Sequence, residues 1–182
     1  MILLIPVVGI IILALWIAMM YNGLVRAVNH VKDSWAGIDV ELKRRYDLIP
    51  NLVATVKGYA AHEKEVLESV IQARASACAS QGSPGTQARD ENALIGGLRR
   101  LFAVVEQYPA LKASRHFLEL QQELTQTEDR IQRARRFYNG NVRDLNNRIE
   151  VFPSNIIAGL FSFQRAEYFE IDDASRAVPD VE

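Results

Sequence analysis

The first apolar run of the chain limits its fold more than any other feature. Residues 2–20, ILLIPVVGIIILALWIAMM, contain no charged side chain. A helix of this length is about 28 Å long, close to the hydrocarbon thickness of a bilayer. We therefore predict a transmembrane anchor over residues 1–21. Ile2, Leu13 and Met20 belong to its apolar span, and Trp16 and Tyr21 suit the headgroup interface.

The flanks of this run predict its orientation. A cleaved signal peptide is the competing interpretation, and it fits poorly because no Lys or Arg precedes the run and no A-x-A-like site follows it. Five basic residues follow the span within 25 positions: Arg26, Lys32, Lys43, Arg44 and Arg45. The positive-inside rule therefore predicts an external N-terminus and a cytoplasmic domain. A periplasmic domain stays open as the alternative, because the rule weakens for long translocated domains.

Beyond the span, apolar residues recur every three or four positions, which is the period of an α-helix. Four stretches show it: residues 24–46, 48–80, 90–108 and 114–152. No stretch of useful length has the two-residue period of a β-strand. The sequence therefore predicts an all-α fold, with an antiparallel four-helix bundle over residues 22–152.

Prolines and glycines mark the predicted breaks. QGSPG at residues 81–85 predicts a loop, and the residues before Pro109 and Pro153 disfavour helical geometry. Pro50 leaves two possibilities open: a new helix that begins at Asp47, or one long helix with a kink. The second gives the alternative fold, a long helical hairpin kinked near Pro50 and Pro109.

The C-terminal part changes character. Residues 153–169 include the apolar stretch IIAGLFSF at 156–163. Packing under the bundle is favoured over a position on the membrane surface, because no basic face accompanies the run. Residues 170–182 form an acidic stretch that we expect to be a mobile tail.

One ten-residue motif occurs twice, as YNGLVRAVNH at 21–30 and as YNGNVRDLNN at 138–147, with six identical positions. The two copies are placed symmetrically about Pro84. We predict that they pack antiparallel through one shared helix face, close to the membrane, with small residues allowing close approach and asparagines bridging. A ligand-binding motif used twice and a chance resemblance are the alternatives. The packing residues would be Tyr21, Asn22, Gly23, Val25, Asn29, Tyr138, Asn139, Gly140, Val142 and Asn146.

Two charged residues interrupt the apolar stripe of residues 48–80. Glu63 and Arg74 are candidates for a buried ion pair or for groups at a protomer boundary. Each is expected to have a partner, because a lone buried charge costs several kcal/mol.

The sequence shows no constellation for catalysis, for a cofactor or for a metal. The three histidines, His30, His62 and His116, fall in different predicted helices, and HEKEV lacks the second histidine of a zinc-protease motif. Cys78 is the only cysteine and is expected to be a small packing residue. We therefore expect no enzymatic activity.

The charge balance gives no sign of a nucleic-acid partner. Formal net charge is −1. The basic patch of Arg130, Arg133, Arg135 and Arg136 has no accompanying aromatic platform. A solvated or subunit-facing surface is favoured for it over contact with lipid headgroups.

Two stretches of this chain resemble the LemA family. They are residues 21–74, which begin YNGLVRAVNHVKDSWAG, and residues 105–155, which include RFYNGNVRDLNNRIEVFPSN. The resemblance extends to about residue 169. It implies a membrane-anchored helical bundle of the bacterial inner membrane with a very short external N-terminus, and it implies no enzymatic activity.

These features predict a non-catalytic membrane scaffold that self-associates into a homo-oligomer. The alternative is a regulatory or substrate-adaptor subunit of another membrane protein, such as a quality-control protease.

Overall fold

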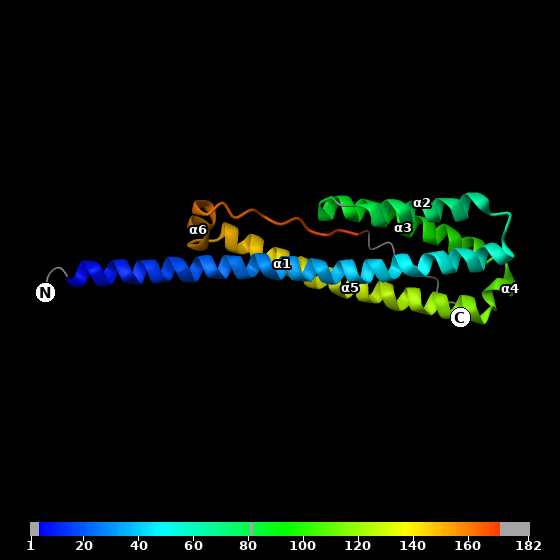
Figure 1. The fold of residues 1–182 in the computed structure, drawn as a ribbon, viewed down its shortest axis with the longest axis horizontal. Coiled ribbons are helices and arrows are strands. Elements are labelled where there is room, and N and C mark those ends of the chain that lie inside the picture. Colours follow the sequence, from blue (N-terminus) through cyan, green and yellow to red (C-terminus); the bar gives the residue numbers. More distant parts are fainter. Residues whose placement is uncertain (1–3, 81, 172–182) are drawn as a thin grey trace. The chain divides into compact units, whose positions relative to one another are not determined.

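The computed structural model describes residues 4–80 and 82–171 (Figure 1). Ile2 and the acidic stretch from residue 172 onward lie outside the described residues. No strand occurs within the described ranges, and the prediction of an all-α fold is confirmed. The helices are α1 (Leu4–Tyr59), α2 (Lys64–Ala79), α3 (Pro84–Val105), α4 (Pro109–Lys112), α5 (Arg115–Glu150) and α6 (Ser154–Leu160).

The chain divides into two compact units. Among the described residues, the anchor unit comprises 4–36 and 136–166, and the bundle unit comprises 37–80, 82–135 and 167–171. The two long helices, α1 and α5, each contribute one part to either unit. The units are described one at a time.

In the bundle unit, α1 and α5 supply the two segments that complete a four-helix arrangement with α2 and α3. α2 and α3 run side by side along their lengths (Figure 1). The apolar stripes of the sequence form its core. Buried members include Ile38, Leu42, Ile49, Val53 and Val56 of α1, Leu67 and Val70 of α2, Leu94, Leu98 and Leu101 of α3, and Phe117, Leu120, Leu124 and Ile131 of α5.

Pro50 lies inside α1, and the helix continues through it to Tyr59. Proline has no N–H group, so the carbonyl of Tyr46 lacks the helical donor that residue 50 normally supplies. The Nε atom of Arg74, on α2, donates a hydrogen bond to this carbonyl at 2.6 Å. Of the two possibilities that the sequence left open, the structure has one long helix, and a donor from a neighbouring helix satisfies the carbonyl that Pro50 leaves without its helical partner.

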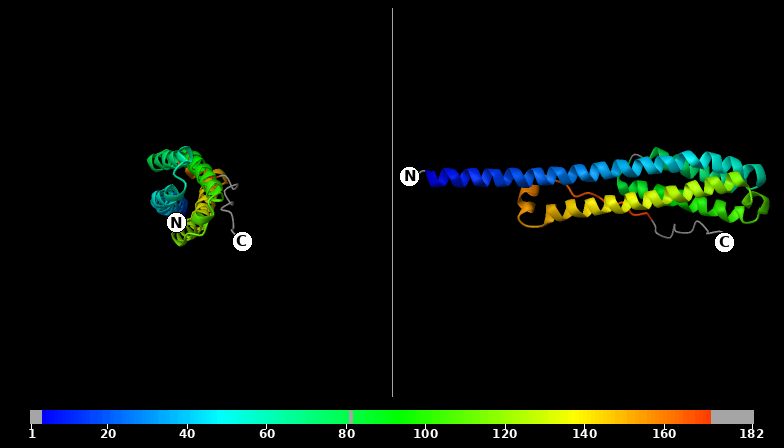
Figure 2. Two further views of the ribbon diagram at one scale, coloured as in Figure 1. Left: turned by 90° about the vertical axis from the view of Figure 1, so that its right-hand side faces the viewer. Right: turned by 90° about the horizontal axis from the view of Figure 1, so that it is seen from below.

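In the anchor unit, the last part of α5 runs antiparallel to α1 (Figure 2). Asn141 Nδ2 donates to the carbonyl of His30 at 3.3 Å, and Arg148 Nη1 donates to the carbonyl of Gly23 at 3.4 Å. The antiparallel course that the repeated motif predicts is present at these positions. Trp35 on α1 and Tyr138 on α5 also pack edge to face, with ring centroids 5.2 Å apart.

The two copies of the motif do not bury the same face, which corrects the prediction. The second copy buries Tyr138 and Val142. Their counterparts in the first copy, Tyr21 and Val25, are exposed and half-buried. The first copy instead buries Leu24 together with Ala27. Identical residues of the two copies therefore lie in different environments in the two helices.

The glycines and asparagines of the motif also differ from the prediction. A Cβ atom built on Gly140 would meet no atom within 4 Å, and one on Gly23 would meet only the end of the Arg148 side chain, so neither glycine allows two backbones to approach closely. Asn146 is buried, and it exchanges two hydrogen bonds with the backbone of Ala166, at 3.0 and 2.9 Å. Its counterpart Asn29 is exposed. The buried asparagine thus fixes the C-terminal segment rather than its own counterpart.

The first part of α1 is long and apolar enough to span a membrane, by length and composition. Leu13 is exposed along this part of the helix. Trp16 and Met20 are partly buried, and they pack against a cluster that includes residues of α6. The ring of Tyr21 lies 4.8 Å from that of Phe161. The predicted interfacial residues of α1 therefore contact the segment that follows α5.

Candidate functional site: a buried charged cluster

A cluster of polar side chains lies inside the bundle unit, where four helices meet. Arg45 and Tyr46 come from α1, Gln87 and Glu91 from α3, and Glu128 from α5. Arg45 and Glu91 are both 0% exposed. Large charged side chains are almost never fully buried without partners, so this cluster is the most unusual feature of the bundle interior.

The two ends of Arg45 bind two carboxylates. Its Nη2 atom donates to Glu91 Oε2, and its Nη1 atom donates to Glu128 Oε2 at 2.7 Å. Glu91 is fully buried, whereas the Glu128 side chain keeps 17% of its surface in solvent. One arginine of α1 is thus tied to both α3 and α5.

The second oxygen of Glu91 is occupied as well. The hydroxyl of Tyr46 donates to Glu91 Oε1, and Gln87 Nε2 donates to the same oxygen at 2.8 Å. Gln87 Nε2 also lies 3.2 Å from the carbonyl of Ala77 on α2. Every helix of the four-helix arrangement therefore contributes to one hydrogen-bonded network, which defines how far each helix can slide along its neighbours.

The electrostatics of the cluster favour one set of charges. Burial alone would lower the pKa of Arg45, but the carboxylates of Glu91 and Glu128 outweigh it and raise that pKa above its ordinary value. Burial, followed by the negative charge of Glu91, also raises the pKa of Tyr46. The arginine therefore stays cationic and the phenol stays a neutral hydrogen-bond donor.

The sequence contains a signal for this cluster. Arg45, one of the basic residues that follow the span, also follows Leu42 by three positions and precedes Ile49 by four. Glu91 precedes Leu94 by three positions in the same way. Both charges thus occupy the buried stripe of their helix, and the phase of the stripe was the available clue.

The predicted pair of Glu63 and Arg74 is corrected by the structure. Both side chains are only partly buried. The Oε1 atom of Glu63 lies 3.5 Å from the hydroxyl of Tyr108, and the Nε atom of Arg74 donates a hydrogen bond to the carbonyl of Tyr46. The buried ion pair of the bundle is formed by Arg45 and Glu91 instead.

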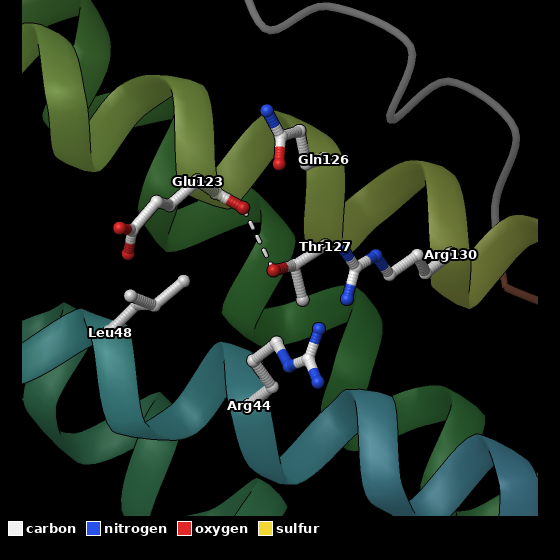
Figure 3. Close-up of a pocket in the computed structure, with 6 residues that line it drawn as sticks. All are labelled: Arg44, Leu48, Glu123, Gln126, Thr127 and Arg130. Atoms are coloured by element: carbon white, nitrogen blue, oxygen red, sulfur yellow. Dashed lines mark hydrogen bonds between the residues drawn. The ribbon is translucent and has the colours of Figure 1, made fainter.

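A shallow surface hollow lies between α1 and α5 beside this cluster (Figure 3). Arg44 and Arg130 extend toward each other across it, and the hydroxyl of the buried Thr127 donates to the carbonyl of Glu123 at 2.8 Å. Arg44 adjoins Arg45 in sequence but is exposed. The hollow is therefore lined by two arginines and by the carboxylate side chain of Glu123, whereas Arg45 and Glu91 of the cluster lie inside the bundle.

The remaining reactive side chains are dispersed. His30 and His116 are exposed on α1 and α5, and His62 lies in the turn between α1 and α2. Within the described ranges, no three His, Cys, Asp or Glu residues are grouped as a metal site. Cys78 is exposed on α2, so the expectation that it packs in the core is wrong.

Comparison with known proteins gives the chain a family. The sequence profile of the LemA family matches residues 34–182. Magnetosome protein MamQ 2 of Paramagnetospirillum magneticum is 29% identical over 177 residues, a match that covers 84% of this chain and 65% of that protein. The chain thus spans slightly less than two thirds of that relative. Protein LemA of Metamycoplasma hominis is 27% identical over 162 residues, with 87% and 73% covered. The helical fold, the apolar first helix and the profile match agree, and this chain belongs to the LemA family.

Proposed function

We propose that this membrane-anchored helical protein is a non-catalytic scaffold that self-associates in the plane of the membrane, with its bundle unit in the cytoplasm. The observation that carries the proposal is the engagement of the buried cluster. Both oxygens of Glu91 accept hydrogen bonds from side chains of the bundle itself. Groups that are engaged in this way hold helices together and present no acid or nucleophile to a substrate.

The chemistry of the cluster suits a structural role. A buried ion pair adds little net stability compared with apolar residues of similar volume, and the best-attested use of such polar groups is to fix register and partner choice. Neither the family description nor the names of the relatives denotes an enzyme. A scaffold needs a bundle of defined shape, and the cluster provides that definition.

Self-association is supported by the anchor and by the surface. A membrane-spanning helix confines all copies to one plane, which raises their effective concentration for one another. The bundle unit also exposes large apolar side chains. These are Val40 and Tyr59 of α1, Ile71 of α2 and Leu118 of α5, at 60%, 49%, 51% and 45% exposure. Contacts between copies would bury such residues.

Native mass spectrometry of the detergent-solubilised full chain tests the proposal. We expect one homo-oligomer of defined copy number, and we expect Ile71→Glu to reduce that number or the population of the assembly. Gln72→Glu is the matched control, because Gln72 is an exposed neighbour on the same helix. A monomer that co-purifies with a membrane protease would overturn the scaffold and favour the adaptor function.

A further inference from the structure

The segment that follows α5 presents two different faces. Ile157 and Ala158 of α6 are buried, at 2% and 1% exposure, against Leu24 of α1. Ile156 and Leu160 of the same helix are 56% and 70% exposed. Buried and exposed apolar residues thus alternate around a helix that bears no charge.

The whole loop around α6 lacks charged residues. Residues 151–164, VFPSNIIAGLFSFQ, contain none. Their flanks are tied together by an ion pair between Arg165 Nη2 and Glu150 Oε1 at 2.5 Å and by the paired hydrogen bonds of Asn146 with Ala166. The loop therefore has a fixed base and an apolar tip. Its large exposed residues are Val151, Phe152, Ile156, Leu160 and Phe161, at 59%, 74%, 56%, 70% and 48% exposure.

The position of the loop on α1 indicates what covers that tip. The core formed by Leu24 and α6 also receives Trp16, Ile17 and Met20 from the end of the uncharged run of α1. The ring of Tyr21 contacts those of Phe161 and Phe163, at 4.8 and 5.7 Å. α6 is therefore held where the apolar part of α1 ends, and the first basic residue of the chain follows only at Arg26.

We propose that the α6 loop inserts its exposed apolar residues into the interfacial layer of the same bilayer that α1 crosses. The exposed apolar residues of the loop belong to a segment that packs against Trp16, Ile17 and Met20 at the end of the apolar part of α1, and this position favours lipid as the occupant. Interfacial segments bury one apolar face at the boundary of headgroups and acyl chains, and aromatic and aliphatic residues are typical of that face. The stretch has no basic face, which is why the sequence alone favours packing, but its contacts with α1 hold it at the end of the apolar run without the help of charged residues. The loop thus gives the anchor unit a second contact with the membrane, which fixes the tilt and rotation of α1. This inference does not depend on self-association.

Depth-dependent quenching in vesicles tests the inference. The full chain, with Cys78→Ser, carries a single fluorescent label at Leu160→Cys and is reconstituted into vesicles of phosphatidylcholine and phosphatidylglycerol. We expect several-fold stronger quenching by nitroxide-labelled lipids than by aqueous iodide. A label at Gln72→Cys, on the exposed surface of α2, is the control and should show the reverse preference.

Two other results would overturn the inference. Strong quenching of the Leu160 label by iodide, as at Gln72, would show that the loop faces water. Protection from both quenchers would show that protein covers the loop, as in a contact with a second copy of the chain. A second label at Phe161→Cys guards against an effect of one substitution on folding, and both labelled proteins should retain the wild-type circular dichroism spectrum.

Discussion

Replacing Glu91 with glutamine should destabilise the bundle by far more than an ordinary polar substitution. The amide keeps the shape of the carboxylate but removes its charge, so the fully buried Arg45 keeps only Glu128 as a counter-charge. Breaking a buried pair by removing one partner costs about 3–5 kcal/mol. For a chain of this size, that corresponds to a fall of about 6–20 °C in the melting temperature.

A double-mutant cycle separates this explanation from a simple packing defect. Arg45→Met alone strands the carboxylate of Glu91 and should cost a similar amount. Because the double variant Arg45→Met/Glu91→Gln leaves neither of these charges buried, it should cost clearly less than the sum of the two single variants. Glu128→Gln is the control, and we expect a loss of only about 1–3 kcal/mol because Glu128 reaches solvent.

Denaturant titration of the detergent-solubilised chain, followed by far-ultraviolet circular dichroism, measures these differences. A loss of less than about 1 kcal/mol for Glu91→Gln would refute the reasoning, since it lies well below the cost of about 3–5 kcal/mol for removing one partner of a buried ion pair. The reasoning would also be refuted if the double variant lost as much stability as the two single variants together, because Arg45 and Glu91 would then not depend on each other.

The cluster also has a pH signature. The pKa of Tyr46 is raised in the folded chain by burial and by Glu91, whereas an unfolded tyrosine titrates near pH 10. The stability that Tyr46 contributes is therefore fully present below about pH 10 and is lost as the pH rises toward the folded pKa. The difference in unfolding free energy between the wild type and Tyr46→Phe should narrow above about pH 10, and an unchanged difference would contradict this account.

Three further results are expected. Gly140→Leu should stabilise the protein by about 0.5–1 kcal/mol, because open space surrounds this helical glycine. Gly97→Leu is the comparison in the same denaturation assay. It should destabilise the protein, because a Cβ atom at residue 97 would already lie 3.4 Å from a side chain of α2. Arg74→Met should cost about 1–3 kcal/mol, and much less in a Pro50→Ala background, where the helix regains its own donor; an equal cost in both would contradict the capping role. With a cytoplasmic bundle, Cys78 should resist an impermeant thiol reagent in intact cells and react after permeabilisation; labelling in intact cells would reverse the orientation.

The helices and most of their boundaries could be predicted because they depend on local pattern. The 3.6-residue period defined the buried stripes, and the loop at 81–85, Pro109 and Pro153 separate helices as expected. One boundary is missed, because residues 48–80, which the period predicts as one helical stretch, are divided between α1, which ends at Tyr59, and α2, which begins at Lys64. The course of the chain at Pro50 was left open by the sequence. It is associated with a donor from Arg74, which lies 24 positions further along the chain on another helix, and no local rule reports such a donor.

The repeated motif does not predict how its two copies pack, because sequence identity does not define how two helices are set along each other. Symmetric packing would set Gly23 opposite Leu145 and His30 opposite Tyr138. The hydrogen bonds instead join Gly23 to Arg148 and His30 to Asn141, a shift of three residues in both cases. A shift of almost one helical turn sets different residues of the two copies against each other.

Only part of the buried cluster can be predicted from the sequence. The phase of the stripe placed Arg45 and Glu91 on buried faces, while their partners Tyr46 and Glu128 depended on how the helices are set against one another. Side-chain pairs between helices come from tertiary packing, which a pattern along one chain does not specify.

The central claim is that this LemA-family chain acts by assembling. Single-particle imaging of the wild-type full chain in lipid nanodiscs tests it most directly. We predict uniform particles that contain several copies of the chain, with the bundle units arranged on one side of a shared membrane disc. Discs that each hold a single 20.5 kDa chain, at protein concentrations where the membrane is crowded with copies, would contradict it.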